Sequence, residues 1–406
     1  MHIVLLNDDA LPKARGGAAV IVDHLRKVFS AAGHRVTLIT THQDSNDEIR
    51  MDDATGTTIS IPVQYNLKKR HRMCVRNPAV SSHIERLFTE LKPDVVHAHN
   101  LHTYLTYESL KIAKKYTNQI VLTAHDTFLV SFDRVRGTAY ENAALKSKGY
   151  RMHWWNHLCA GGRKYWPLRN GSIKKIIQAS ETKVAAISHA TEQFLTANHI
   201  PVQSVIPNGL ASDGEPTQED VDAFRNRMNL TGPTILFAGR IRKDKGIHAL
   251  LGMMEHILNT VPNAQLLVAG EKERLPQVSD GVRDAVIATG WITPEEMRTA
   301  YAACDVVATP SLYLDNFPTV NLEAALAGKP VVGTCFGGTP EVVIEGETGF
   351  IRNPHEKEAF AEAIITLLQN ADEARRMGSA GRKRIEDAFS LQKQVDGYLA
   401  LFAVSS

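Results

Sequence analysis

Short continuous apolar runs recur along the chain, separated by longer segments in which apolar residues return every three or four positions. Runs such as 2–6, 234–238 and 306–308 do not alternate with polar residues, which is typical of strands buried on both faces of a parallel sheet. The segments between them have the period of amphipathic helices. This order predicts an α/β protein with two successive Rossmann-like βαβ units.

The expected elements fall into two series separated by the phrase Pro207-Asn208-Gly209. Strands of the first series are expected at 2–6, 35–40, once within the polar stretch 43–60, and at 93–97, 119–123, 183–187 and 204–206. Strands of the second series are expected at 234–238, 265–269, 285–289, 306–308, 330–333 and after the turn 346–350. Helices are expected over 20–28, after Asn100 to 115, and over 247–258, 294–303, 318–326, 355–369, 371–388 and 392–402.

Composition places the chain among ordinary globular proteins. It has 406 residues, of which 43% are hydrophobic and 22% charged, and no apolar run approaches the ~20 residues of a membrane span. The start MHIVLLNDDALP lacks a basic segment, so we interpret it as a first strand and not as a signal peptide. The four cysteines show no metal-ligand spacing, which favours free thiols and a cytoplasmic protein.

Charge is distributed unevenly. Residues 1–205 hold 27 Lys and Arg against 17 Asp and Glu, a net charge of +10, whereas residues 206–406 hold 19 against 27, a net charge of −8. The basic half is suited to an anionic acceptor or an anionic membrane surface, and ordinary solvated surface is an equal alternative. The same alternatives apply to the basic segment 66–76. The aromatic and basic region 128–175 is either an acceptor-side surface or a locally packed lid.

The stretch 309–349 carries the strongest chemical signal. Asp315 follows an apolar strand, Pro318 is of a type favoured in the first turn of a helix, and Glu323 lies about a turn and a half inside that helix. Free backbone N–H groups and the helix dipole make such a helix start suitable for phosphate. A sugar nucleotide offers hydroxyls, a diphosphate and a ribose diol to this arrangement.

This stretch resembles the signature of the retaining family 4 glycosyltransferases, Glu-x7-Glu followed by Ala, and reads D-N-F-P-T-V-N-L-E-A here. Asp315 stands where the family has its first Glu. The resemblance implies the GT-B fold, with two Rossmann-like domains facing each other across a cleft and a C-terminal helix crossing back to the first domain. It implies a first domain of 1–205 plus 390–406 and a second of 206–389.

The resemblance also implies roles for particular residues. It places Gly16 and Gly17 near the donor phosphate and the acceptor, and His125 near the anomeric carbon of the donor sugar. Arg240 and Lys245, in a loop that begins at Gly239, match the family's diphosphate clamp.

The remaining implied contacts are with the rest of the donor. Trp291 and Ile292 belong to the loop that reads the nucleobase. Asp315 would bind sugar hydroxyls, helped by backbone groups of Asn316 and Phe317 before Pro318, and Glu323 would hold the ribose. Asp is one methylene shorter than Glu, so a closer loop, a water or a different donor sugar is expected to fill about 1.5 Å.

The predicted activity is a retaining transfer of a hexose-type sugar from a nucleoside diphosphate to an acceptor hydroxyl, in glycan, lipopolysaccharide or glycolipid assembly. No cofactor and no metal are expected, since the adjacent pairs Asp8-Asp9 and Asp52-Asp53 are not the D-x-D of metal-dependent transferases. UDP-, GDP- and ADP-sugars all fit as donors, and a glycan, a lipid-linked molecule or a small molecule fits as acceptor. No nucleic-acid partner is expected.

The sequence also bears on the location of the protein and on two alternative functions. The enzyme is expected in the cytoplasm, with peripheral contact at the inner membrane face left open. A sugar-nucleotide epimerase of the same fold would need catalytic carboxylates and a histidine in the first domain, and Arg240 with Lys245 argues against it. A non-catalytic sugar-nucleotide sensor is the other alternative, and it is favoured only by Asp315 in place of Glu.

Overall fold

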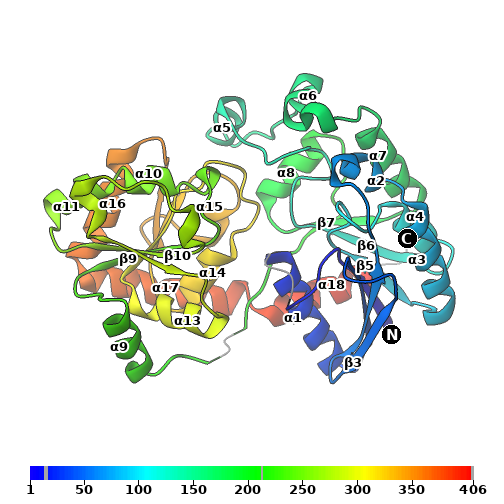
Figure 1. Cartoon of the computed structure of the whole chain (residues 1–406), viewed down its shortest axis with the longest axis horizontal. Helices are drawn as coiled ribbons and strands as arrows, with labels where there is room; N and C mark the ends of the chain where they lie inside the picture. The colour runs from blue at the N-terminus through cyan, green and yellow to red at the C-terminus, as the bar shows by residue number, and fades with distance from the viewer. Residues whose placement is uncertain (13–16, 212–213, 404–406) are drawn as a thin grey trace. The chain divides into compact units, whose positions relative to one another are not determined.

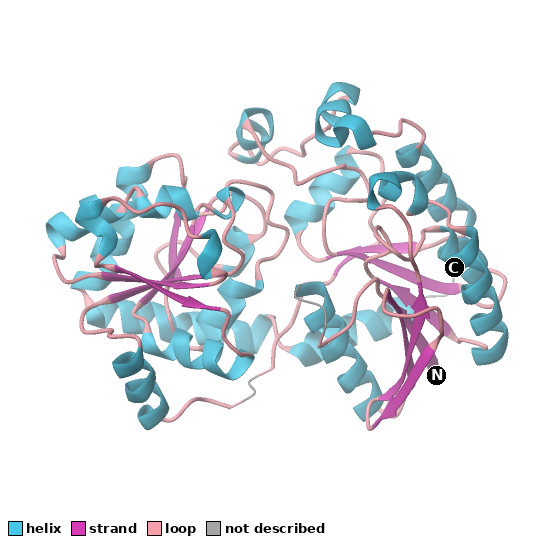
Figure 2. Cartoon of the chain, in the orientation of Figure 1, coloured by secondary structure: helices cyan, strands magenta, loops and turns pink. Residues whose placement is uncertain are grey.

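The computed structural model describes residues 1–12, 17–211 and 214–403, and the chain forms two compact units (Figure 1). Unit 1 comprises Met1–Val135, Gly149–Gly209 and Leu391–Ser406, and unit 2 comprises Arg136–Lys148 and Leu210–Ser390. The sequence boundaries did not anticipate that residues 136–148 belong to unit 2. In each unit, helices lie on both faces of a central sheet (Figure 2).

Unit 1 is built on a sheet with the strand order β3-β4-β2-β1-β5-β6-β7-β8. Every neighbouring pair is parallel except β3 and β4. The strands are β1 (His2–Leu6), β2 (Arg35–His42), β3 (Ile49–Asp53), β4 (Gly56–Pro62), β5 (Val95–Ala98), β6 (Gln119–Ala124), β7 (Lys183–Ala186) and β8 (Ser204–Val205). The expected parallel core is therefore present, with its carboxyl ends along one edge.

The helices of unit 1 include the last helix of the chain. They are α1 (Gly17–Ala31), α2 (Arg70–Met73), α3 (Pro78–Leu91), α4 (Glu108–Ala113), α6 (Trp154–Gly161), α7 (Arg169–Ala179), α8 (His189–Ala197) and α18 (Leu391–Ala403), with the 3-10 turns η1 (Leu67–Lys69) and η2 (Gly162–Lys164). Val395 and Tyr398 of α18 pack in one core with Leu5 of β1 and Leu25 of α1. The return of the last helix to the first domain is thus observed.

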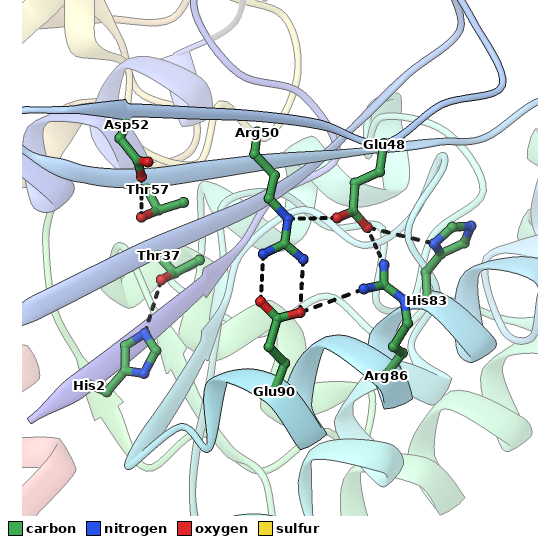
Figure 3. A network of polar contacts seen from close by, with 9 residues as sticks. All are labelled: His2, Thr37, Glu48, Arg50, Asp52, Thr57, His83, Arg86 and Glu90. Carbon is green, nitrogen blue, oxygen red and sulfur yellow. Dashed lines mark hydrogen bonds and ion pairs between the residues drawn. The ribbon is translucent and has the colours of Figure 1, made fainter.

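The polar stretch 43–60 differs from the expectation of a loop and one short strand. It forms β3 and most of β4, and β3 is the antiparallel edge of the sheet. Every residue of β3 is exposed, so no apolar run marks it in the sequence. Arg50 on β3 donates to both carboxylate oxygens of Glu90 on α3, at 2.5 and 2.8 Å, and also pairs with Glu48 at 2.8 Å (Figure 3). This ion-pair network ties the edge strand to α3.

Unit 2 has a fully parallel sheet with the order β11-β10-β9-β12-β13-β14. Its strands are β9 (Thr234–Ala238), β10 (Gln265–Ala269), β11 (Val286–Gly290), β12 (Val306–Thr309), β13 (Val331–Thr334) and β14 (Gly349–Arg352). Its helices are α5 (Thr138–Ala144), α9 (Gln218–Arg227), α10 (Ile247–Leu251), α11 (Met254–Thr260), α12 (Asp280–Arg283), α13 (Pro294–Ala303), α14 (Thr319–Leu326), α15 (Thr339–Val342), α16 (Lys357–Gln369) and α17 (Ala371–Ala388), with η3 (Lys243–Lys245) and η4 (Lys272–Arg274).

Local sequence signals explain several helix ends of unit 2. Thr293 caps α13 by accepting from the Glu296 N–H at 3.2 Å, while the Glu296 carboxylate accepts from the Thr293 N–H, as the sequence predicts. The single helix expected over 247–258 was wrong: it is divided into α10 and α11 at Gly252, which caps α10. No helix of the described residues is long and apolar enough to cross a membrane.

Gly378 on α17 permits a close helix crossing in unit 2. A Cβ at this position would lie 1.9 Å from the carbonyl oxygen of Gly328, which follows α14. We expect Gly378→Ala to destabilise the protein by about 1–3 kcal/mol, because the helices must separate. Gly281→Ala is the matched control, since its Cβ would meet nothing within 4 Å and alanine favours helix by ~1 kcal/mol. Calorimetric melting of both variants measures the difference, and equal melting temperatures would contradict the packing argument.

Candidate active site

Three loops of unit 2 meet where the neighbouring strands β9, β12 and β13 end. Glycines let their backbones touch. A Cβ on Gly246, after β9, would lie 1.9 Å from the carbonyl oxygen of Pro310, after β12. Cβ atoms on Gly337 and Gly338, after β13, would lie 2.2 Å from the carbonyl oxygens of Asp315 and Asn316. Gly246 and Gly337 also have φ values of 83° and 71°, a region that favours glycine.

Backbone hydrogen bonds complete the junction. The N–H of Leu312 donates to the carbonyl oxygen of Asp244 at 2.8 Å, and the N–H of Gly338 donates to that of Asp315 at 2.8 Å. The three loops therefore form one rigid platform at the carboxyl edge of the sheet, the place at which open α/β sheets bind ligands.

Lys245 and Asp315 are paired on this platform. The Lys245 ammonium donates to Asp315 Oδ2 at 2.7 Å, and the Ser311 hydroxyl donates to the same oxygen at 3.2 Å. Burial lowers the pKa of Lys245, but the neighbouring Asp315 carboxylate more than offsets this, so the net shift is upward and the lysine stays charged. An ammonium has three donors, so beside its hydrogen bonds to Asp315 and Tyr313 the lysine keeps one N–H for an anionic ligand. The sequence assigned these residues to different parts of the donor and did not predict that they pair.

Arg240 and Gly239 lie at the start of the same loop as Lys245. Gly239 has a φ of 125° and donates its N–H to Ala269 at 3.0 Å, which turns the chain out of β9. Arg240, the next residue, is exposed. The loop thus carries two cations with different surroundings. Arg240 is exposed to solvent, and Lys245 is held within the platform.

The acidic residue on α14 lies where the sequence places it. Pro318 is the N-cap and not the first helical residue, and Glu323 is the fifth residue of α14. Glu323 Oε2 accepts from the Tyr301 hydroxyl at 2.7 Å. Burial raises the pKa of Glu323, while the hydrogen bonds from Tyr301 and Thr319 oppose that rise. Tyr301 is a partner that the sequence did not identify.

The other predicted donor-binding residues range from buried to exposed. Asn316 and Phe317 are buried, and the Phe317 ring packs 5.5 Å from that of Phe389, so only its backbone is suited to a ligand. Trp291, after β11, is 60% exposed, and Ile292 is half-buried.

Two side chains missed by the sequence analysis stabilise the platform. Asn321, fully buried on α14, accepts from Thr309 at the end of β12 at 3.0 Å and donates to Thr339 of α15 at 3.2 Å. Tyr140 of α5 is buried beside Phe336, and its hydroxyl accepts from the Gly337 N–H at 3.1 Å. Asn321 occupies one of the unspecified positions between Asp315 and Glu323 in the signature, and Tyr140 lies far from its partner in the sequence.

His125 of unit 1 follows β6 and belongs to a row of three histidines. Its Nε2 lies 2.9 Å from His99 Nδ1, and the rings of His99 and His97 are 4.1 Å apart. His97 Nε2 lies 2.8 Å from the Thr123 hydroxyl, which donates in turn to Tyr398 of α18 at 3.0 Å. Gly17 is the first residue of α1, and Gly16 lies outside the described residues.

Burial keeps this histidine row neutral. It lowers the pKa of His97 to about 3 and that of His125 to about 4, and the pKa of His99 lies well below its ordinary value. His99 Nε2 is buried without a partner among the described atoms. Burying an unprotonated ring nitrogen without a partner costs less free energy than burying an N–H donor without one. This favours a His99 that donates from Nδ1 to His125 Nε2, which leaves the proton of His125 on Nδ1.

Metal binding has no evident site on the described residues. Over 1–12, 17–211 and 214–403, no group of three or more His, Cys, Asp or Glu side chains is arranged to hold an ion. Asp8 instead accepts from the N–H groups of Thr103, Tyr104 and Leu105 at 2.6 to 2.9 Å. Its carboxylate therefore fixes the loop after β5.

Comparison with known proteins agrees with this arrangement. Residues 15–213 match Glycosyltransferase Family 4, and residues 218–384 match Glycosyl transferases group 1. Glycogen synthase of Mycobacterium tuberculosis is 24% identical over 97% of this chain and 92% of its own length.

Solved structures show the same architecture. Sucrose-phosphate synthase of Thermosynechococcus elongatus superimposes with a TM-score of 0.74 at 23% identity, covering 100% of both chains. Anabaena HepE in complex with UDP-glucose gives a TM-score of 0.67 at 18% identity over 98% of both chains. The fold is GT-B, as the sequence predicts. The chain belongs to the family 4 (group 1) glycosyltransferases and is a glycosyltransferase.

The buried histidines predict a pH dependence of stability. An unfolded histidine titrates near 6.5, so between about pH 6.5 and pH 3 the unfolded chain binds the proton that folded His97 refuses. Stability therefore falls as the pH falls. We expect wild type to lose about 3 kcal/mol more than His97→Phe between pH 7 and pH 4.

Urea unfolding followed by tryptophan fluorescence measures this loss, because three of the four tryptophans lie in unit 1. A substitution at the exposed His248 of unit 2 is the control. Parallel pH profiles for wild type and His97→Phe would contradict the proposed burial of a neutral ring.

Proposed function

We propose that the enzyme transfers a hexose-type sugar, with retention of anomeric configuration, from a nucleoside diphosphate sugar to an acceptor hydroxyl without a metal ion. The observation that carries this proposal is the platform of unit 2, where Lys245 is held beside Asp315 and Arg240 lies on the same loop. The known structures of UDP-glucose-bound HepE, and of a starch synthase with ADP and acarbose, support a nucleotide-sugar donor. The bound nucleotide differs between those proteins, with UDP-glucose in one and ADP in the other.

The proposed chemistry follows from these charges. The acceptor oxygen forms a bond to the anomeric carbon as the bond to the β-phosphate oxygen breaks on the same face of the sugar. The acceptor proton passes to the departing phosphate, which leaves as part of the nucleoside diphosphate. Arg240 and Lys245 stabilise the negative charge that develops on this group, so protein cations serve where other transferases use a divalent ion.

The remaining residues have proposed binding roles. Asp315 orients Lys245 and accepts from sugar hydroxyls, and Glu323 holds the ribose diol. His125, with its proton on Nδ1, donates to the sugar near the anomeric carbon. In these roles the residues match the transition state in shape and in the direction of their dipoles, and no covalent intermediate is required.

The state of the cysteines supports a cytoplasmic location. All four cysteines are free thiols, and Cys159 is exposed, which suits a reducing compartment such as the cytoplasm. The product would enter glycan, lipopolysaccharide or glycolipid assembly, with peripheral contact between the basic first domain and the membrane. Membership of a transferase family favours this activity over an epimerase or a sensor on the same fold.

The direct test incubates the protein with UDP-, GDP- and ADP-sugars and measures the release of free nucleotide, with and without a chelator. We expect release with one donor class, unchanged by the chelator, and a product whose anomeric proton has the donor's configuration by NMR. Donor binding without turnover would support the sensor and contradict the transferase proposal. A chelator-sensitive rate would contradict metal independence.

Lys245→Ala tests the charge on the platform. We expect turnover to fall by about two to three orders of magnitude, since a preorganised charge contact to the leaving group is lost. Lys243→Ala is the matched control, because Lys243 lies two residues earlier in the same 3-10 turn and is exposed. Steady-state kinetics with the active donor measures both variants. Equal rates for Lys245→Ala and wild type would remove Lys245 from the site.

A further inference from the structure

An open groove of about 830 Å³ on unit 1 is surrounded by positive charge. Its lining comes from two segments: one spans η1, α2 and the residues that follow, and the other comprises η2 and Trp166. Six cationic side chains line it: Lys68, Lys69, Arg72, Arg76, Arg163 and Lys164. No acidic residue belongs to its lining.

Most of this charge is uncompensated within the protein. Arg76 pairs with Glu108 at 3.2 Å. Among the described residues, the other five cations have no ion pair or side-chain hydrogen bond, and all six are exposed. Like charges gathered around one groove repel one another and raise the local positive potential. Such a cluster contrasts with β3 and α3 of the same unit, where Arg50 and Arg86 are both paired with glutamates.

The helix α2, which supplies part of the groove lining, packs against a buried cluster. In this cluster Arg169 is fully buried, with its guanidinium 4.9 Å from the centre of the Phe132 ring, and it donates to the carbonyl oxygens of Phe128 and Ser131. His71 of α2 packs its ring 4.7 Å from that of Phe132. Burial and the nearby arginine Arg169 lower the pKa of His71 to about 3, so the ring is a neutral packing element. The cations of α2 are therefore carried by a helix whose buried face is packed.

This cluster connects the groove to the loop that contains His125. Phe128, which Arg169 holds, donates its N–H to the Asp126 carboxylate at 2.8 Å, and Asp126 is the neighbour of His125. Cys74, which lies between the lining residues Met73 and Val75, is also connected to the sheet. Its carbonyl oxygen accepts from the N–H of Tyr107 at 2.7 Å, and Tyr107 lies in the segment after β5. The groove thus lies on the carboxyl edge of the sheet, together with the candidate site residues of unit 1.

We propose that this groove binds the phosphate groups of an acceptor substrate, so that the acceptor is a phosphorylated or pyrophosphorylated molecule. This inference rests on the proposed function and names its acceptor class. Phosphate groups carry up to two negative charges each, and Arg and Lys bind them by charge-assisted hydrogen bonds. Cations from two separate segments that line one groove can contact several oxygens of a discrete polyanion at once, which favours a soluble phosphorylated molecule over a flat membrane surface.

Binding of inorganic tripolyphosphate, measured by calorimetry, tests the groove without knowledge of the acceptor. The groove variant is the triple substitution Lys69→Gln, Arg72→Gln and Arg163→Gln. The control variant is Arg35→Gln, Arg151→Gln and Lys175→Gln, which removes the same charges from exposed positions of unit 1 outside the groove. Any binding at the loops of unit 2 is common to all three proteins.

We expect the groove variant to bind tripolyphosphate at least about tenfold more weakly than wild type, and the control variant to bind it about as well. Equal affinity for all three proteins, or an equal loss in both variants, would overturn the proposal. Co-sedimentation with phosphatidylglycerol vesicles separates the second source of phosphate. Vesicle binding that the groove variant loses, without competition from tripolyphosphate, would assign the groove to a membrane and overturn the acceptor proposal.

Hydrolysis of the donor in the absence of acceptor separates this inference from the proposed function. The groove variant should release nucleotide at the wild-type rate, because every residue that lines the groove belongs to unit 1 and the leaving-group cations belong to unit 2. Its KM for a phosphorylated acceptor should rise about tenfold, with little change in kcat. An unchanged KM would overturn the acceptor assignment. Absence of nucleotide release by wild type with every donor would refute the proposed function and leave the tripolyphosphate result to be judged by itself.

Discussion

The absence of side chains at three glycines is the constraint on which the platform of unit 2 depends. Gly246, Gly337 and Gly338 bring backbone against backbone where β9, β12 and β13 end, at distances that any Cβ would prevent. The loops then carry their charged groups as parts of one body. Preorganised charge is effective in catalysis because no reorganisation is needed when the transition state forms.

The candidate site residues of the two units differ in charge. Unit 2 buries a charged pair, in which the Asp315 carboxylate keeps Lys245 protonated despite burial. Unit 1 contains a row of three neutral histidines, because burial lowers the pKa of His97, His99 and His125. A fixed cation suits a departing diphosphate, whereas a neutral hydrogen-bond donor suits a sugar hydroxyl. The charge state of each group thus supports the role that we propose for it.

Much of this could be predicted from the sequence where local pattern dominates. Buried parallel strands such as β9 are continuous apolar runs, and the capping box at Thr293 and Glu296 is a local signal. The edge strand β3 has no apolar signal, since all of it is exposed and an ion-pair network holds it. The split of α10 from α11 at Gly252 was missed because a helical period continues across it.

The candidate site was predicted as a set of residue types, and its internal contacts were not. Motif spacing identified Lys245 and Asp315, but the 2.7 Å pair between them depends on how three loops fold together. Tyr140 reaches Gly337 from a segment that the sequence assigned to the other domain. Such long-range partners have no local pattern, so only the folded chain reveals them.

The most direct test of the central claim is a crystal structure of the protein with a non-transferable nucleotide-sugar analogue. The account predicts diphosphate oxygens within hydrogen-bond distance of the Lys245 ammonium and the Arg240 guanidinium, above the glycine junction. Phosphates bound elsewhere, with the Lys245–Asp315 pair out of reach of the ligand, would contradict it.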